Sequence, residues 1–235
     1  MAINKNSNGY TFAFAIIMVV VVGTLLAVAS QGLKSRQDKN TSDKKMINIL
    51  GAINVEASRD NAQEMFNKYV VESKIISGED LSAPAFDVDI KKEFRDKSLT
   101  ILDRNYPLYI CEKEGNRYYV IPVVGTGLWG PIWGFVAIDS DYKTIYGATF
   151  DHKGETPGLG AEIKQSSYSD QYAGEVVADY SGVFIPIIVV KDGSGKGMNS
   201  KVDGITGGTI TSKGVEEMTT RTLGVYVNYF NSLNN

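Results

Sequence analysis

The sequence predicts an α+β fold, in which one N-terminal transmembrane helix precedes a single soluble domain with an antiparallel sheet flanked by helices. Three observations predict this class: an uncharged apolar run at the start, alternating strand-like runs in the middle, and helical patterns on both sides of them. Strands in a run with helices bunched around them are typical of α+β domains. The expected segments are an N-terminal tail (1–9), the transmembrane helix (10–30), a connecting helical segment (31–57) and the soluble domain (58–235).

The composition is that of one folded domain with a short additional segment. The 235 residues are 43% hydrophobic and 22% charged, with a formal net charge of −3. No nucleic-acid partner is expected, because neutralising phosphates requires a clustered excess of Lys and Arg. The single cysteine, Cys111, and the single histidine, His152, are too few for a zinc or iron–sulfur site. We therefore expect no metal site, and any redox chemistry would need an organic cofactor.

The N-terminal apolar run has the length of a membrane-spanning helix. Residues 10–30 carry no charged side chain, and about 20 apolar residues in a helix cross the hydrocarbon core of a bilayer. The alternative is a cleaved signal peptide, for which Ala27 and Ala29 offer a cleavage pattern. The apolar region of a signal peptide normally covers only about 7–15 residues, so the length favours a retained anchor.

The charges beside this run favour a soluble domain in the cytoplasm. Lys34, Arg36 and Lys39 follow the run, whereas only Lys5 and the amino terminus precede it. The more basic flank of a transmembrane helix usually lies on the cytoplasmic side.

Helical and strand patterns follow one another along the soluble region. A helix is expected over residues 58–70, which open with a capping serine and then place apolar residues at helical spacing. An antiparallel meander is expected over residues 108–125 and 132–152, because each stretch contains turn residues between two alternating runs. The remaining expected elements are a helix (161–172), a strand (184–190) and a last helix (210–231).

The segment before the last helix favours phosphate binding. Residues 203–208 are mostly small and flexible and lead into a helix expected to begin near Thr209. The first turn of a helix offers free backbone N–H groups and the positive end of the helix dipole. Thr209 and Thr211 place hydroxyls beside such an anion. An ordinary N-cap made by a threonine explains the same pattern, so on the residues alone both interpretations stay open.

Two more glycine-rich loops lie between expected elements. Residues 125–134 join two strands and contain both tryptophans, Trp129 and Trp133. Their indoles can wall a flat ligand, although core packing is the simpler explanation for one of them. Residues 152–160 open the next helix, and His152 is expected to be structural because no carboxylate stands at a fixed spacing from it.

The C-terminal segment resembles the flavinylation motif of the FMN-binding domain family. Residues 203–209 read D-x-x-T-G-G-T, and the family pattern is D-x-x-[ST]-G-A-[ST], whose last hydroxyl residue forms a phosphoester with FMN. The resemblance implies one covalent FMN per chain, attached through its phosphate to Thr209. Gly208 replaces the family's usual alanine, which removes one methyl group and loosens the turn.

Three motifs in order and spacing resemble the family of C subunits of the sodium-translocating NADH:quinone oxidoreductases. They are G-x-G-L-W-G-P-I-W-G, H-x-G-E-T-P-G-L-G and the flavinylation motif, and the resemblance covers nearly the whole chain. It implies that Glu155 and Thr156 hydrogen-bond the polar edge of the isoalloxazine. The expected FMN-binding residues are Leu128, Trp129, Glu155, Thr156, Gly158, Leu159, Asp203, Thr206, Gly207, Gly208, Thr209 and Thr211.

The resemblance also implies a function and a set of partners. The chain would be a membrane-anchored relay in a translocating enzyme complex, with no NADH or quinone site and no catalytic residue of its own. Its FMN would receive electrons from an iron–sulfur subunit and pass them to another subunit that bears a flavin. A flavin transferase would attach the FMN. The family places this domain on the periplasmic side of the bacterial inner membrane on a single-pass anchor, and large domains translocate despite modest flanking charge.

Other functions remain open at this point. The G subunits of the related ferredoxin:NAD oxidoreductase (Rnf-type) complexes share the flavinylation and E-T-P-G-L-G patterns, whereas the full G-L-W-G-P-I-W run favours the quinone reductase. A non-enzymatic, membrane-tethered module could use the same glycine-rich helix start to bind a partner or a phosphate ligand. A free-standing flavoenzyme would need an acid–base constellation that the sequence does not offer.

Overall fold

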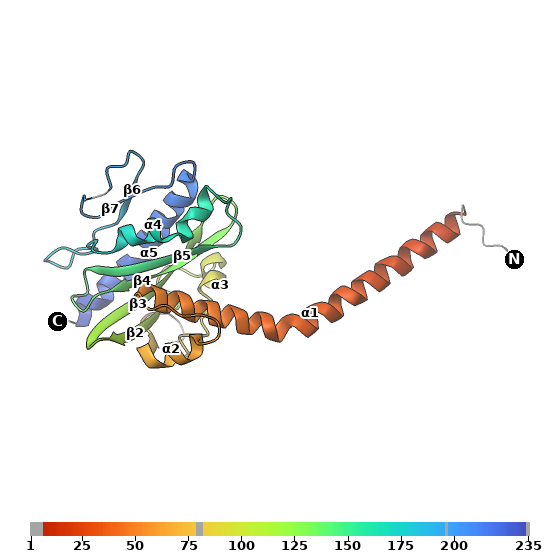
Figure 1. Cartoon of the computed structure of the whole chain (residues 1–235), viewed down its shortest axis with the longest axis horizontal. Coiled ribbons are helices and arrows are strands. Elements are labelled where there is room, and N and C mark those ends of the chain that lie inside the picture. Colours follow the sequence, from red (N-terminus) through yellow and green to blue (C-terminus); the bar gives the residue numbers. More distant parts are fainter. Residues whose placement is uncertain (1–6, 79–81, 196, 234–235) are drawn as a thin grey trace. The chain divides into compact units, whose positions relative to one another are not determined.

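The computed structural model describes residues 7–78, 82–195 and 197–233 (Figure 1). The chain divides into two compact units, residues 1–44 and residues 45–235. Helix α1 (Asn8–Ala52) begins in the first unit and ends in the second. One 18-residue window of this helix has a mean hydropathy of 2.8 and contains no buried residue, so α1 is long and apolar enough to cross a membrane. The long apolar helix expected at the N-terminus is confirmed.

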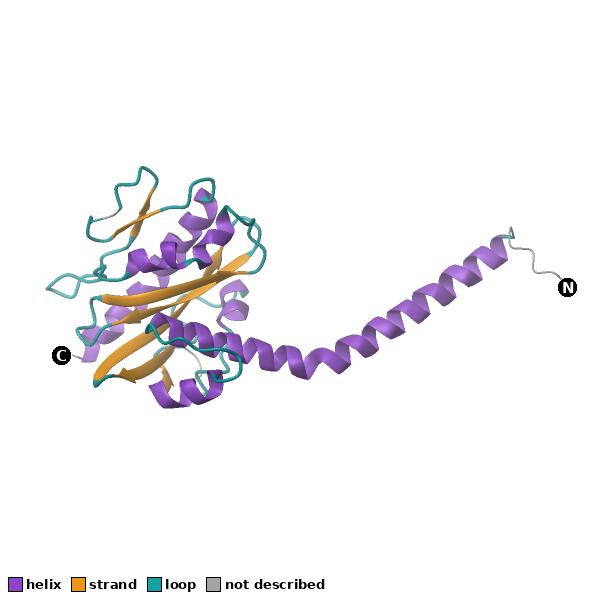
Figure 2. Ribbon diagram, viewed as in Figure 1, coloured by secondary structure: helices purple, strands orange, loops and turns teal. Residues whose placement is uncertain are grey.

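A five-stranded antiparallel sheet forms the centre of the second unit (Figure 2). Its strands lie side by side in sequence order, each hydrogen-bonded to the next. The expected antiparallel meander is confirmed, and one further strand, β1, extends it at one edge. The strands are β1 (Val70–Ile75), β2 (Pro107–Lys113), β3 (Asn116–Thr126), β4 (Pro131–Ile138) and β5 (Ile145–His152).

The sheet separates two hydrophobic clusters. On β2, Leu108 and Ile110 belong to one cluster, and Tyr109 and Cys111 belong to the other, because successive side chains of a strand point to opposite faces. Burial raises the pKa of the Cys111 thiol to about 12. The first cluster includes helix α5 (Thr209–Leu233), and the second includes the C-terminal end of α1 and partly buried side chains of α2 (Ala62–Tyr69).

The helix expected over residues 161–172 is wrong as a single helix. Gln165 has an extended backbone with ψ 146°, which interrupts the helical turns. Serines follow it, and their side chains compete with the backbone for hydrogen bonds. The region consists of three short pieces, η1 (Gly160–Lys164), α4 (Ser166–Ser169) and η2 (Asp170–Tyr172).

The strand expected over residues 184–190 is shorter than its apolar run. Pro186 has no backbone N–H for a strand ladder. Phe184 makes only an isolated bridge to Ala178, and the strand itself, β6, is limited to Ile188–Val190. Its partner is β7 (Lys201–Asp203), an unexpected strand that runs parallel to β6.

Helical boundaries also differ at the start of the second unit. The helix expected from Ser58 begins at Ala62, because the Ser58 backbone N–H donates to the Asn61 side chain at 2.7 Å and forms a turn instead. Helix α3 (Ile90–Arg95), which was not expected, is capped by the Asp89 carboxylate. The last helix is confirmed, since α5 covers residues 209–233.

Candidate cofactor-binding site

A glycine turn and one serine shape the start of α5. Gly207 has φ +74°, a conformation that glycine adopts without steric cost, and a Cβ there would lie 2.6 Å from Leu159 Cδ2. Ser212 Oγ accepts the backbone N–H of Ile205 at 3.0 Å and donates to the Gly208 carbonyl at 3.0 Å. Ser212 therefore fastens the glycine turn to the helix.

Thr209 occupies the first position of α5 with an unengaged hydroxyl. Among the residues that the structure describes, none forms a hydrogen bond with this hydroxyl, and the side chain is half-buried. The first turn of the helix surrounds it with free N–H groups and partial positive charge. Since Ser212 makes the hydrogen bonds that hold the preceding glycine turn, the Thr209 hydroxyl is available to a ligand.

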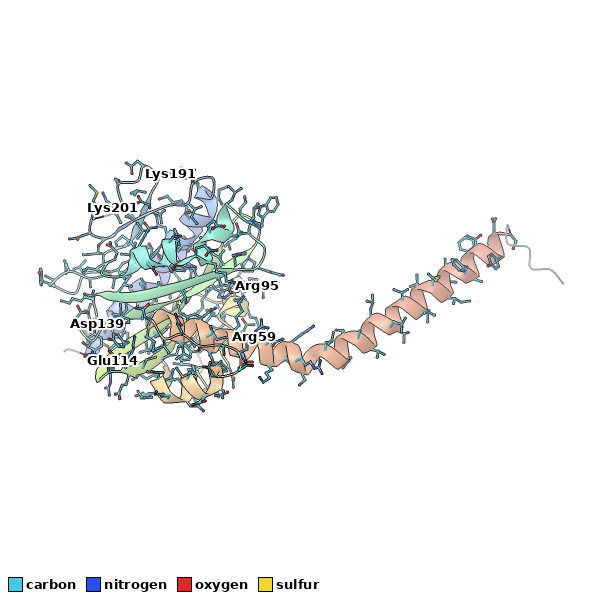
Figure 3. The ribbon with its side chains drawn as sticks, in the orientation of Figure 1. Arg59, Arg95, Glu114, Asp139, Lys191 and Lys201 are labelled. Carbon is cyan, nitrogen blue, oxygen red and sulfur yellow. The ribbon has the colours of Figure 1, made fainter. Side chains whose placement is uncertain are left out.

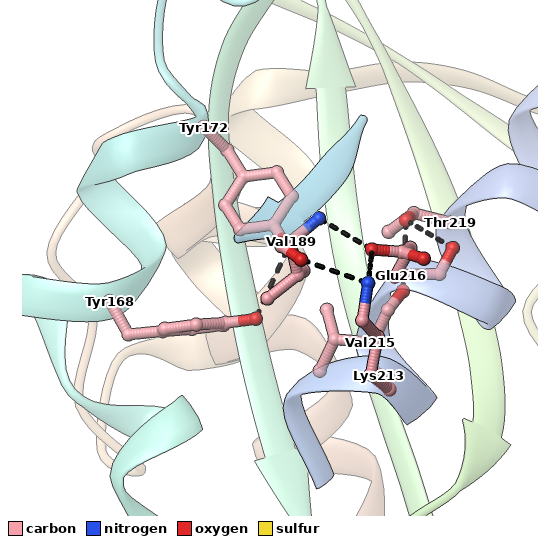
Figure 4. A network of polar contacts seen from close by, with 7 residues as sticks. All are labelled: Tyr168, Tyr172, Val189, Lys213, Val215, Glu216 and Thr219. Carbon is pink, nitrogen blue, oxygen red and sulfur yellow. Dashed lines mark hydrogen bonds and ion pairs between the residues drawn. The ribbon is translucent and has the colours of Figure 1, made fainter. Parts of the chain in front are cut away.

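A cleft of about 170 Å³ opens beside Thr209. Lys213 lines it and lies 2.6 Å from Glu216 Oε2, while its Nζ also donates to the Val189 carbonyl at 2.9 Å (Figure 4). Lys191 lines the cleft as well and is exposed to solvent (Figure 3). Two ammonium groups beside a helix N-terminus favour an anion. The other lining residues are Val189, Gly204, Ile205, Thr206, Gly207 and Ser212.

Two buried tyrosines stand close to this ion pair. The hydroxyls of Tyr168 and Tyr172 lie 3.3 Å apart (Figure 4). Burial raises the pKa of both, and the nearby Glu216 carboxylate contributes in the same direction. Both hydroxyls therefore remain protonated over the physiological range and form part of the core.

Glu155 joins the two loops to the start of α5. Its Oε2 accepts the Thr211 hydroxyl at 2.5 Å, and its Oε1 accepts the Trp129 backbone N–H at 2.8 Å. The Glu155 backbone N–H donates to Nδ1 of His152 at 3.1 Å. Only 4% of Glu155 is exposed, so its carboxylate binds protein groups inside the domain.

Large apolar side chains of the same segments face solvent. Trp129 is 68% exposed, and Leu128, Leu159 and Ile210 are also exposed. They belong to the two loops and to the first turn of α5, the segments that meet at Glu155 and Gly207. Exposed apolar patches of this kind on a folded domain mark binding sites, and these side chains can wall a planar aromatic ligand.

Three other expected site residues have local partners. The Asp203 carboxylate accepts the Gly195 N–H at 2.8 Å and so holds the glycine-rich loop before β7. The Thr156 carbonyl accepts the backbone N–H of Leu159 at 3.1 Å. Gly158 has φ +75°, and its N–H donates to Glu162 Oε1 at 2.9 Å.

The expected site residues thus form two groups. Thr206, Gly207 and Thr209 share the cleft. Trp129 and Thr211 meet on the carboxylate of Glu155.

Gly208 leaves no free space for the alanine of the flavinylation pattern. A Cβ at this position would lie 2.9 Å from Ile205 Cγ2 and 3.2 Å from the Gly160 backbone nitrogen. Contacts below 3.0 Å require the neighbour to move. In this chain the branched side chain of Ile205 therefore lies where the methyl group of an alanine at position 208 would need space.

Sequence reasoning missed both lysines of the cleft. Lys213 stands one helical turn after Thr209, and this i, i+4 spacing places them on one side of the helix. The position of Lys213 beside Thr209 could therefore have been predicted from the sequence. Lys191 comes from the end of β6, and no local pattern connects it to the motif.

Comparison with known proteins matches nearly the whole chain. A family model described as "FMN-binding domain" matches residues 127–224, which include both loops and the start of α5. Relatives named as the C subunit of the Na(+)-translocating NADH-quinone reductase are 31% identical in Yersinia pestis, covering 91% of this chain and 87% of the relative, and 31% identical in Vibrio anguillarum, covering 92% and 90%. The chain belongs to this C-subunit family.

A solved structure from the same family has the same fold. The crystal structure of the Na(+)-translocating NADH-quinone reductase C subunit from Parabacteroides distasonis superposes with a TM-score of 0.75 and 40% sequence identity, over 84% of this chain and 96% of that one. The resemblance to the C-subunit family that the motifs indicated is confirmed, and so is the α+β class with a long apolar N-terminal helix.

Proposed function

We propose that this chain is the electron-relay subunit of a Na(+)-translocating NADH-quinone reductase, with FMN joined covalently to Thr209. The FMN-binding family model and the named relatives support the cofactor and the complex. The observation that carries the attachment site is the unengaged hydroxyl of Thr209, at a helix N-terminus and beside a cleft lined by Lys191 and Lys213. These groups fit a phosphate ester, because N–H donors and ammonium groups stabilise its negative charge.

Attachment is a phosphoryl transfer from FAD that a flavin transferase would catalyse. The bond between Thr209 Oγ and phosphorus forms, the P–O bond to AMP breaks, AMP leaves, and the hydroxyl proton passes to solvent. The helix N-terminus stabilises the resulting phosphodiester by about 0.3–1 kcal/mol at an exposed position. Lys213, which lines the same cleft, would place an ammonium group near this anion.

FMN supplies one-electron chemistry, and the protein holds and surrounds it. Trp129, Leu128 and Leu159 would cover part of the planar ring, because their side chains face solvent next to the helix start. The open side of this patch would leave one edge of the ring accessible to a partner, which electron entry and exit require.

The proposed assembly places the chain in the bacterial inner membrane. α1 would be its single anchor, and the domain that follows would lie in the periplasm. The partners would be an iron–sulfur protein of the complex as electron donor, a flavin-bearing one as acceptor, and the transferase during maturation. The name of the relatives, which describes one subunit of a larger reductase, supports the presence of partner subunits.

Intact-mass measurement tests the attachment site. After co-expression with a flavin transferase, we expect the wild-type mass to increase by one FMN less one water, and Thr209→Ala to lose this increase completely. Thr206→Ala is the matched control, since it removes a neighbouring hydroxyl that lines the same cleft, and it should keep the flavin. A flavin retained by Thr209→Ala, or a colourless wild type, would reject the proposal, and the second result would favour a tethered binding module.

A further inference from the structure

One buried carboxylate connects three segments that are far apart in the sequence. Glu155 accepts a hydrogen bond from the Trp129 backbone, 26 positions earlier, and another from the Thr211 side chain, 56 positions later. The first segment is the β3–β4 loop, and the last is the first turn of α5. The same turn carries Thr209.

Glycines surround this carboxylate closely. A Cβ at Gly127 would lie 2.6 Å from Glu155 Oε1, and a Cβ at Gly160 would lie 2.6 Å from Glu155 Oε2. A buried carboxylate is costly unless donors satisfy it. Here each oxygen has a donor at 2.8 Å or less, so the two glycine loops and the two donors together determine where Glu155 can lie.

We propose that Glu155 is a positioning residue, which fixes the loop bearing Trp129 relative to the first turn of α5 before FMN is attached. In this role its carboxylate does not contact the isoalloxazine, because both oxygens bind protein donors and the side chain is buried. The inference rests on the proposed attachment at Thr209.

The two hydrogen bonds of Glu155 would affect flavin attachment by fixing the positions of the groups that take part in it. Thr211 is two positions after Thr209 on one helical turn, so the contact that holds Thr211 also fixes the backbone that carries the acceptor hydroxyl. The second contact holds the backbone of Trp129, whose exposed ring would lie against the flavin. Reactions that need two groups in a fixed arrangement are faster when that arrangement exists beforehand.

Hydrogen exchange in the full-length, flavin-free chain tests the bridge directly. The Thr211 hydroxyl donates to Glu155, whose other oxygen holds the β3–β4 loop, so Thr211→Val tests whether this contact carries the effect to the loop. We expect the Trp129 amide to exchange about tenfold faster in Thr211→Val, and Thr211→Ser to restore slow exchange because it keeps the hydroxyl. Equal exchange of this amide in wild type and Thr211→Val would overturn the proposal.

The rate of flavin attachment is the second measurement. With FAD and the transferase, Thr211→Val should be modified about tenfold more slowly than wild type, and Thr211→Ser should recover the rate. Normal attachment despite a mobile Trp129 amide would overturn the positioning role while leaving the proposed attachment intact. Flavin found on Thr209→Ala would instead reject the attachment site, and the exchange measurement would still decide the role of Glu155.

A second pair of variants protects the test against misfolding. Exchange of the β3 amides serves as the folding control. If these amides lose protection in Thr211→Val, the comparison passes to Glu155→Ala and Glu155→Gln. The glutamine keeps an oxygen that accepts the Trp129 N–H and an amide group that can pair with the Thr211 hydroxyl. The Trp129 amide should therefore exchange slowly in Glu155→Gln and about tenfold faster in Glu155→Ala. Equal exchange in both variants would overturn the proposal.

Discussion

Three hydroxyl side chains at the start of α5 have three different environments. Ser212 fastens the glycine turn, Thr211 donates to Glu155, and the Thr209 hydroxyl has no partner within the described parts of the chain. The sequence pattern placed hydroxyls at this helix start but could not distinguish their roles. The distinction depends on Glu155, which is 56 positions from Thr211, and helical spacing carries no information about so distant a contact.

Lys45 is a half-buried cation at the beginning of the second unit. Its ammonium donates to the Phe86 carbonyl and lies 4.6 Å from the centre of the Phe86 ring. Burial lowers the pKa of Lys45 from 10.5 to about 8, although Asp87 and Asp89 act in the opposite direction. Between pH 8 and pH 10.5 the unfolded chain therefore binds more protons at this position than the folded chain does.

The stability of the domain should depend on pH through Lys45. Stability rises with pH wherever the unfolded state binds more protons, so the cost of burying this ammonium is complete below pH 8 and disappears towards pH 10.5. We therefore compare the free energies of unfolding of Lys45→Met and wild type. The difference between them should favour the variant by about 1–3 kcal/mol more at about pH 7.5 than at about pH 10.5. Urea unfolding of both proteins across this range measures the difference, in which the titration of tyrosines cancels. Parallel stability curves would contradict the prediction.

At the scale of elements, α5 approaches β3 through glycines. A Cβ at Gly214 would overlap the Thr126 carbonyl oxygen, and a Cβ at Gly125 would lie 2.8 Å from Met218 Cβ. The two backbones are therefore closer than side chains larger than hydrogen allow. This packing fixes the height of the helix above the sheet and thereby the position of its first turn.

Alanine substitutions in α5 should separate packing from helix propensity. Gly214→Ala should destabilise the domain by about 1–3 kcal/mol, because the new methyl group collides with the backbone of β3. Gly224→Ala is the control in the same helix, since its nearest neighbour, Phe184 Cδ1, lies 3.6 Å from the added Cβ. It should be neutral or stabilising by up to about 1 kcal/mol. Thermal unfolding of the two variants decides this, and equal melting temperatures would contradict the packing argument.

Elements with a regular pattern were predictable, and interrupted ones were not. The meander and α5 follow from alternation and helical spacing that packing then satisfies. The helix expected over residues 161–172 failed at Gln165, and the strand before Val190 failed at Pro186. β1 directly follows α2 at Val70, and no turn residue marks that change.

At the scale of the whole molecule, α1 contributes to both compact units. Ile49 and Leu50 of α1, together with Ile53 directly after the helix, are fully buried and belong to the cluster on the second face of the sheet. The domain boundary suggested at Ser58 therefore lies inside the second unit, which starts at Lys45. We propose that the soluble domain includes this end of α1.

Two truncated chains test this boundary. A chain that begins at Lys45 should be soluble and should melt cooperatively, because it keeps Ile49, Leu50 and Ile53. A chain that begins at Ser58 should fail to fold, since each lost core side chain costs about 2–5 kcal/mol against a total stability of about 5–15 kcal/mol. Circular dichroism during heating measures both. Cooperative melting of the shorter chain at the same temperature would show that this segment is dispensable.

The burial of Cys111 has a practical consequence for finding the domain's side of the membrane. Its thiol is fully enclosed, and burial raises its pKa to about 12, so it stays protonated and unreactive. Because the chain has no other cysteine, one introduced at the fully exposed Tyr180 would be its only reactive thiol. A membrane-impermeant maleimide applied to intact spheroplasts would label that position if the domain faces outward. The native protein, whose Cys111 is unreactive, would give no label.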